Sequence, residues 1–432
     1  MHISAFGAAL RTPDLRKKIF FTIGMLAVYR LGSVVPTPGV DYAAIQRCID
    51  VVQDNSVYAL INLFSGGALL QLSVFALGIM PYITASIILQ LLTVVIPRLE
   101  TLKKDGQAGQ AKITQYTRYV TIGLAILQST AIISLARTPG ALFSGCDERV
   151  IPNDAIWVIL VMIIVMTAGT AVIMWFGELI TERGVGNGMS ILIFTSIIAT
   201  IPSQFAGIWG SQGVFTFSLT LAVGLAVVGF VVFVEQAQRR IPVQYAKRMV
   251  GRRMYGGTST YIPLKVNMAG VIPVIFASSL MFLPVLLVQL TGSESGWAVW
   301  VQTNLSTGSG SIYALFYFLL IIFFCYFYVS ITFNPVEVAD NMKKYGGFIP
   351  GIRAGRPTAE YLDYVLTRLT APGSLYLGVI AVLPLLAFDF LGVGSQFIFG
   401  GTSLLIMVGV GLDTVKQIEA QLQQRNYEGF LR

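Results

Sequence analysis

The chain has 432 residues, of which 55% are hydrophobic and only 12% are charged, with a formal net charge of +8. This charged fraction is about half that of an ordinary soluble domain, so the composition excludes a soluble globular protein and indicates an integral membrane protein. With His2 as the only histidine and no C-x-x-C spacing among the three cysteines, no metal-ligand cluster can be assembled. We therefore expect neither a metal nor another cofactor.

Ten apolar segments are long enough to cross a bilayer as helices, which takes about 20 residues each. In chain order, the predicted spans are residues 19–35, 72–96, 119–136, 155–176, 189–205, 215–234, 266–290, 312–333, 375–391 and 397–412. Most of the 29 Lys and Arg residues fall in the N-terminal tail, in the loops after even-numbered spans and at the C-terminus. Because positively charged loops stay on the cytoplasmic side, both termini are expected to be cytoplasmic.

The stretch that includes the second span, residues 55–97, contains no charged side chain. It is too long for one crossing and too short for two crossings joined by a polar turn. Because the Ser-Gly-Gly sequence at 65–67 breaks a helix, the pattern predicts a short apolar half-helix at 58–64 ahead of the full span. Lipid cannot satisfy the backbone of a half-helix, so surrounding protein must wrap it or it must line a cavity.

An uncharged outer loop at residues 202–213 is expected to join two five-helix halves, residues 1–201 and 214–432. An odd number of spans in each half implies that the halves have opposite orientations in the membrane. Each half contains a long span interrupted by proline, at Pro81 in the first half and at Pro284 in the second. Proline is also tolerated in membrane helices as a simple kink, which is the alternative interpretation.

Two cytoplasmic loops are larger than packing alone requires. Residues 235–265 contain two extended-looking runs, QRRIPVQYAKR and GRRMYGG, around a tip near Arg252 and Arg253. Residues 334–370 contain NPVEVADNMKKYGGFIPGIRAGRPT, which includes Arg353. Long loops punctuated by Pro and Gly are typical of functional sites. The alternative is that their cations only set the topology and attract anionic lipid.

Two glycine-rich segments, GVGNG at 184–188 and GGFIPGIR at 346–353, lack the G-x-x-x-x-G-K-[ST] pattern of a phosphate-binding loop. A break before the fifth span explains the first of them better. We expect no nucleotide site and no enzymatic activity. Transport against a gradient needs free energy, so the motor must be another molecule.

Several further motifs stand out along the chain: FSGGAL, FALGIMPYITASII, GELITERGVGNGMSI, VQYAKR, PLKVNMAGVIP, TFNPVEVADNMKK, FIPGIR and FGGTSLLI. Together these motifs resemble those of the SecY family, whose members are central subunits of protein-conducting channels. The match extends from the N-terminus to the tenth span, and departures lie in the outer loops at 137–154 and 291–311. The resemblance implies an all-α integral membrane protein with ten transmembrane helices, in two pseudo-symmetric inverted halves around a central hourglass pore closed by a re-entrant plug.

The resemblance also implies which residues form the site. The plug would be Tyr58, Ala59, Leu60, Ile61, Asn62, Leu63, Phe64, Ser65, Gly66 and Gly67. The pore ring would be Ile79, Ile83, Ile193, Ile275 and Ile406, with Met189 at a further position where the family has isoleucine. A lateral gate, formed by the second, third, seventh and eighth spans, would carry a polar cluster of Thr84, Gln128 and Asn267.

An isoleucine collar dewets when it is empty and so resists ions, yet it has no fixed partner for any substrate side chain. From the residues alone, the alternative is favoured, because an isoleucine in a membrane helix faces lipid or another helix in most cases. The Thr84 hydroxyl could likewise bond to its own helix backbone instead of across the gate.

By the same resemblance, the motors are the SecA ATPase and the translating ribosome, which would dock on the two cytoplasmic loops through Arg252, Arg253 and Arg353. SecE and SecG would be companion subunits, and signal sequences, nascent polypeptides and membrane lipid would contact the channel. The implied location is the bacterial cytoplasmic membrane. The implied function is to pass unfolded secretory polypeptides across it and to release membrane-protein segments sideways into lipid.

The competing function is a secondary transporter of a small solute, a class that also has inverted repeats and broken helices. Transporters usually place ionisable residues near the membrane midplane, whereas the acidic residues here fall near the ends of spans. These are Glu178, Glu182, Glu235 and Asp413. This placement disfavours the transporter.

Two questions stay open at this point. Arg30 lies within the first span, where it must either reach the interface or find a partner. Cys48 and Cys146 are both expected on the outer side, where an oxidising environment permits a disulfide, but each could equally be a solitary thiol.

Overall fold

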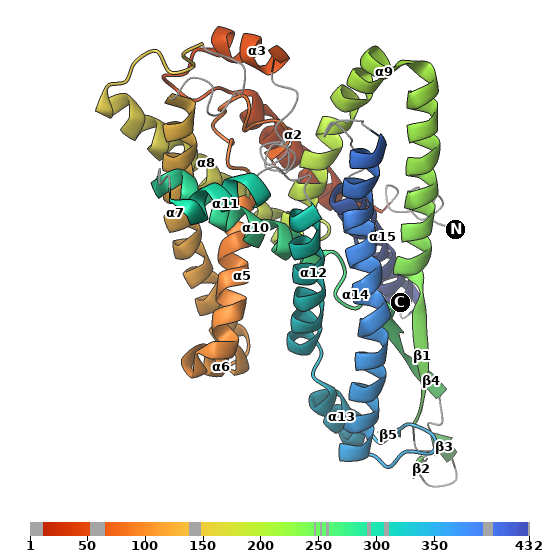
Figure 1. Cartoon of the computed structure of the whole chain (residues 1–432). Coiled ribbons are helices and arrows are strands. Elements are labelled where there is room, and N and C mark those ends of the chain that lie inside the picture. Colours follow the sequence, from red (N-terminus) through yellow and green to blue (C-terminus); the bar gives the residue numbers. More distant parts are fainter. Residues whose placement is uncertain are drawn as a thin grey trace.

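In a computed structural model of the chain, the described residues are 12–51, 65–137, 148–245, 248–250, 253–255, 259–291, 295–305, 311–391 and 401–430. Figure 1 shows that helices dominate this part of the chain. The helices are α2 Pro13–Val34, α3 Tyr42–Val51, α5 Met80–Val95, α6 Pro97–Lys104, α7 Gln107–Arg137, α8 Ile156–Arg183, α9 Gly188–Gln236, α10 Ile272–Thr291, α11 Gly296–Leu305, α12 Ser311–Thr332, α13 Pro335–Lys344, α14 Arg356–Leu391 and α15 Gly401–Phe430.

Each of the ten predicted spans contains a helix, but the helices differ in how well they could cross a membrane alone. Among the described residues, the helical segments that pass by length and apolar composition are Gln107–Arg137, Ile156–Arg183, Gly213–Gln236, Ser311–Lys344 and Arg356–Leu383. The pair α5 and α6, bent by 100°, would make a sixth. Gly188–Pro202 and Ile272–Val285 are shorter apolar helices. This pattern is that of a multi-pass membrane protein.

The predicted second span is wrong in its first part, because residues 66–79 form turns and the helix begins only at Met80. Leu72 has a φ of 44° and Gly78 a φ of 56°, values that an α-helix cannot contain. The backbone of this stretch bonds instead to the end of the first span. Thr37 donates its N–H to the Leu72 carbonyl over 3.0 Å, and Val74 donates to the Val35 carbonyl over 2.9 Å.

The predicted outer loop at 202–213 is also helical, apart from its last residue. The helix α9 is interrupted only at Gly213, with φ 79° and ψ 174°, and Figure 1 shows it turning back on itself. Aromatic side chains hold the turn together: the ring of Phe217 lies 5.7 Å from that of Phe205 and 5.1 Å from that of Trp209. The chain therefore reverses its direction at a single glycine and not through a loop. The division into halves at this point stays a prediction.

The described residues of the two large loops predicted to be cytoplasmic form one small body and not two separate loops. Strand β1 (Gln238–Tyr245) pairs antiparallel with β4 (Ser259–Lys265), and β5 (Gly347–Phe348) from the second loop joins the other edge of β1. A short hairpin of β2 (Arg248–Val250) and β3 (Arg253–Tyr255) lies beyond them. The apolar core of this body comes from both loops, and its buried members are Ile241, Val243, Leu264, Met342, Ile349, Leu362 and Val365.

The helix α10 packs against α5 and α7, which would be a contact between the two predicted halves. The helix α10 also packs against α12, while α8 packs against both α7 and α9. Buried apolar side chains from all these helices belong to a single cluster. The interface between α10 and the pair α5–α7 therefore borders the interior of the protein, which is where the candidate site lies.

Candidate functional site

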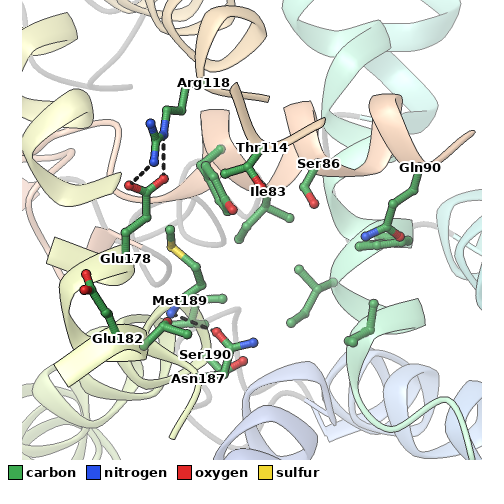
Figure 2. A pocket seen from close by; sticks show the side chains of 16 residues that line it. Ile83, Ser86, Gln90, Thr114, Arg118, Glu178, Glu182, Asn187, Met189 and Ser190 are labelled. Carbon is green, nitrogen blue, oxygen red and sulfur yellow. Dashed lines mark hydrogen bonds and ion pairs between the residues drawn. The ribbon is translucent and has the colours of Figure 1, made fainter. Parts of the chain in front are cut away.

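A cavity of about 530 Å³ lies between five helices, α5, α7, α8, α9 and α10. Figure 2 shows polar and apolar side chains around the cavity, with an ion pair between Arg118 and Glu178. The polar lining consists of Ser86, Gln90, Thr114, Arg118, Glu178, Thr181, Glu182, Asn187 and Ser190. The apolar or aromatic lining consists of Tyr82, Ile83, Met189, Ile193, Ile272, Ile275 and Phe276.

Three of the five isoleucines proposed for the pore ring line this cavity. Ile83 comes from α5, Ile193 from α9 and Ile275 from α10, and all three are buried. Met189, predicted to stand at a sixth position, lines it as well. The remaining two, Ile79 and Ile406, are buried in the same apolar cluster without lining the cavity.

The ion pair in the polar wall joins Arg118 of α7 to Glu178 of α8. The Arg118 Nε donates to Glu178 Oε1 over 2.9 Å, and its Nη2 donates to Oε2 over 2.8 Å, which is the two-pronged geometry of the strongest such pairs. Sequence analysis missed this pair. The signal was present, because antiparallel neighbouring spans bring the start of the third span beside the end of the fourth.

The GVGNG segment forms the turn between α8 and α9 at the edge of the cavity. Gly186 has a φ of 81°, which favours glycine, and the Asn187 side chain caps α9 by accepting from the Met189 N–H over 3.1 Å. The expected break before the fifth span is therefore present, and it places Met189 and Ser190 in the cavity wall.

The three polar residues predicted for the lateral gate are buried, but no hydrogen bond joins them to one another. The Thr84 hydroxyl donates to the Met80 carbonyl of its own helix over 3.0 Å. The side-chain nitrogen of Gln128 has no hydrogen-bond partner within the described residues. Asn267 donates to the Glu235 carboxylate at the end of α9 over 2.6 Å. Its contact is thus within the C-terminal half.

Most of the predicted plug, residues 58–64, lies outside the described residues. Its last three residues are described: Ser65 is buried and accepts a hydrogen bond from the Leu69 N–H over 3.1 Å, while Gly66 and Gly67 have positive φ values of 68° and 89°. The Gly66 carbonyl accepts a hydrogen bond from the Arg30 guanidinium. The cation in the first span therefore has a partner, and that partner is backbone at the base of the predicted plug.

Comparison with known proteins decides the family. A family model described as SecY matches residues 73–415. A relative from Streptomyces scabiei, named protein translocase subunit SecY, is 65% identical over 440 residues, covering 100% of both chains. The chain belongs to the SecY family. It is a membrane protein of the SecY fold.

Solved structures agree with the family in fold. The chain resembles a structure described as that of a protein-conducting channel, with a TM-score of 0.64 and 18% identity over 94% of this chain and 92% of that one. It also resembles Sec61 in the canine ribosome-channel complex from the endoplasmic reticulum, with a TM-score of 0.61 and 18% identity over the same shares.

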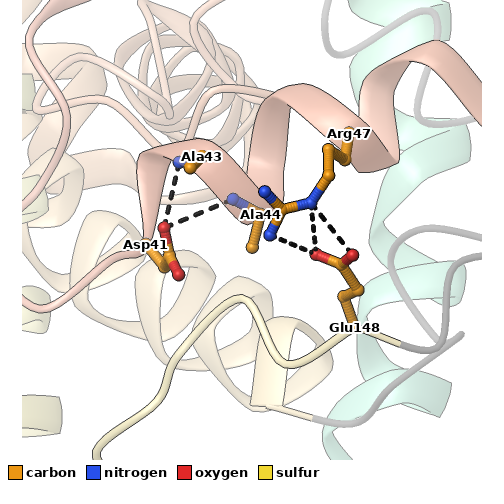
Figure 3. A network of polar contacts seen from close by, with 5 residues as sticks. All are labelled: Asp41, Ala43, Ala44, Arg47 and Glu148. Carbon is orange, nitrogen blue, oxygen red and sulfur yellow. Dashed lines mark hydrogen bonds and ion pairs between the residues drawn. The ribbon is translucent and has the colours of Figure 1, made fainter.

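On the side of this SecY-family protein opposite the β-strands, α3 is fastened to the segment that follows residue 147. Figure 3 shows that the Arg47 guanidinium donates hydrogen bonds to the Glu148 carboxylate, with Nε and Nη2 within 3.0 Å of its oxygens. Hydrogen bonding to this carboxylate raises the pKa of Arg47. Asp41 caps α3 through the N–H groups of Ala43 and Ala44, and its own N–H donates to the Val150 carbonyl over 2.9 Å.

The two described cysteines differ in their oxidation state. Cys48 is disulfide-bonded, whereas Cys325 in α12 is a free, buried thiol. Cys146 lies outside the described residues. Within the described part of the chain, no group of three or more His, Cys, Asp and Glu side chains could hold a metal ion.

Three arginines, Arg252, Arg253 and Arg353, are predicted to contact a motor. Arg252 lies outside the described residues, and Arg253 begins β3, where its backbone pairs with Val250. Arg353 is exposed in the turn before α14. Two glycines with positive φ, Gly351 at 82° and Gly355 at 106°, flank this turn, and the Thr358 hydroxyl donates to the Arg353 carbonyl over 2.8 Å. The backbone is thus held while the side chain projects outward.

Proposed function

We propose that the chain is the channel through which unfolded secretory polypeptides cross the membrane. The observation that carries the proposal is the convergence of Ile83, Ile193 and Ile275 on one cavity between the two halves. An apolar constriction dewets when it is empty, so it resists ions, and it offers no fixed partner to a passing side chain. Ile79 and Ile406 complete the ring in this proposal.

The proposal includes sideways release of membrane-protein segments into lipid. It is supported by the packing of α10 against α5 and α7, because separating these helices would open the cavity toward the bilayer. With no hydrogen bond among Thr84, Gln128 and Asn267, the closed gate depends on apolar packing. An apolar signal sequence could replace that packing with its own. Residues 58–67 act as the plug that closes the channel at rest.

The channel is driven by a partner motor, SecA or the ribosome, and assembles with SecE and SecG. This part of the proposal is supported by the described arginines on the cytoplasmic body and by the similarity to a channel solved in a ribosome complex. Arginine binds both carboxylates and phosphates in a two-pronged geometry, which suits either motor. The chain lies in the bacterial cytoplasmic membrane, with both termini and the joint loop body on the cytoplasmic side.

The experiment is transport by proteoliposomes that contain the chain with SecE and SecG. With SecA and ATP outside, a pre-protein should become protected from added protease, and no protection should develop without ATP. Uptake of small solutes should stay at the level of empty liposomes. Solute uptake without pre-protein protection would instead support a secondary transporter.

A further inference from the structure

Arg30 carries a positive charge on an apolar stretch of α2, where an unpaired cation is unfavourable in a membrane. Its Nη1 donates a hydrogen bond to the carbonyl oxygen of Gly66 and a longer one, of 3.4 Å, to the Ser33 hydroxyl. That hydroxyl donates to the Arg30 carbonyl over 2.7 Å, which holds it beside the guanidinium. The main partner of the cation is therefore a backbone carbonyl 36 residues further along the chain.

The absence of a side chain at Gly66 favours this position. Its φ of 68° lies in the left-handed region, which other residues adopt with difficulty. A Cβ atom at Gly66 would lie 3.2 Å from the Cα of Ser196 in α9 and 3.3 Å from Arg30 Nη1. The backbone at Gly66 is thus held between α2 on one side and α9 on the other.

The neighbouring side chains join the same segments. The Tyr29 and Ser196 hydroxyls share a buried hydrogen bond of 2.7 Å between α2 and α9. The Tyr29 ring also stacks on Phe75, in the turns before α5, with ring centroids 5.9 Å apart. The chain at 65–79 therefore rests on a surface that α2 and α9 form together, with Arg30 as its charged contact.

We propose that Arg30 is a latch that holds the base of the plug in the closed channel and so sets how strong a signal sequence must be to open it. A charged donor makes a stronger hydrogen bond than a neutral one, and a low dielectric strengthens it further. Moving the backbone at Gly66 away from α2 breaks this bond and leaves the cation without its carbonyl. Arg30 is thus a positioning residue, which acts through the plug and touches no substrate.

The latch has a direct test that needs no transport. Ser65 is fully buried beside the latch, so a thiol introduced by Ser65→Cys, in a chain that also carries Cys325→Ser, should react slowly with a membrane-impermeant maleimide. Adding Arg30→Met should speed labelling by roughly 10-fold, the effect of losing a charged hydrogen bond. Arg30→Lys should fall between the two, and Ser33→Ala, which removes both bonds of the Ser33 hydroxyl but leaves the bond from Arg30 to Gly66 in place, should label like the parent. Equal rates for Arg30→Met and the parent would overturn the latch.

Because the role in signal selection rests on the proposed function, it needs a second measurement. Arg30→Met should raise SecA-driven export of a pre-protein with a charged residue in its signal core by roughly 10-fold relative to an intact pre-protein. Where Arg30→Met does not accumulate, Arg30→Gln should give a smaller change in the same direction. Unchanged selectivity despite faster labelling would overturn the role in selection. A parent that exports no pre-protein at all would contradict the proposed function, whereas the labelling rates would still decide whether Arg30 holds the base of the plug.

Discussion

The buried carboxylate of Glu235 accepts a hydrogen bond of 2.6 Å from the side-chain amide of Asn267, which also donates to the Gly270 carbonyl over 3.1 Å. Glu235 lies at the end of α9, and Asn267 lies in the turn that leads into α10. The contact therefore fastens the start of α10, the helix that borders the cavity, to the rest of the C-terminal half. Any movement of α10 away from α5 and α7 is restrained at this point.

We expect Glu235→Ala to loosen the gate. Hydrogen bonds between membrane helices contribute about 0.6 kcal/mol on average and about 1.7 kcal/mol at most, so export of a pre-protein with a defective signal should rise about 3-fold to 18-fold. Glu235→Gln is the matched control, because its oxygen can still accept from Asn267 and its nitrogen can donate to Asn267 Oδ1, which has no hydrogen-bond partner among the described residues. If both variants behave alike, the contact does not restrain α10.

Replacing Ile83 and Ile275 together with asparagine should raise the ion conductance of the resting channel. Both side chains line the cavity, and polar walls hold water that isoleucine excludes. The measurement is single-channel recording in planar bilayers, with the double leucine variant as a control that keeps the wall apolar. Conductance equal to that of the parent would show that these residues do not line the constriction.

Arg353→Glu should severely lower SecA-driven export while leaving membrane insertion and assembly with SecE intact. The side chain is exposed on a turn whose backbone is held, and charge reversal repels an acidic partner where neutralisation only loses an attraction. Arg353→Lys should be intermediate, and neutral substitutions of Lys343 and Lys344 should be tolerated. The assay is pre-protein transport into inverted vesicles at matched protein level. Near-normal transport by Arg353→Glu would show that Arg353 is only part of a solvated basic surface and does not contact the motor.

The disulfide of Cys48 should have Cys146 as its partner, because the chain has three cysteines and Cys325 is free. In denaturant without reductant, alkylation should then add one label to the parent and three after reduction. Cys146→Ser should take two labels without reductant, since it releases Cys48, whereas Cys325→Ser should take none. A Cys146→Ser chain that still takes one label would point to a bond between two chains.

Single thiols introduced near residue 250 and at residue 432 should resist impermeant reagents added outside intact cells. Both positions belong to segments rich in Lys and Arg, which stay cytoplasmic. Disrupting the cells should make both thiols reactive. Labelling from outside would show that these positions are not cytoplasmic, which would contradict the predicted orientation and the ten-span topology.

The sequence by itself determined where most helices form, because a run of about 20 apolar residues in a bilayer must satisfy its backbone internally. Every predicted span contains a helix, and the two extended runs around the tip near Arg252 contain β1 and β3. The resemblance to the SecY family was also evident from the sequence, since the motifs of the family are short runs of consecutive residues. The plug prediction at 58–64 is untested, because those residues lie outside the described part of the chain.

Only the tertiary structure decided the contacts that join distant segments. Residues 72–79 are as apolar as a membrane-spanning helix. They form turns nevertheless, because the backbone at 35–37 forms hydrogen bonds with the start of this segment. The bonds of Arg30 to Gly66, Asn267 to Glu235 and Arg118 to Glu178 span 36, 32 and 60 residues. Which helices become neighbours depends on side-chain packing across the whole molecule, and local composition carries little information about that.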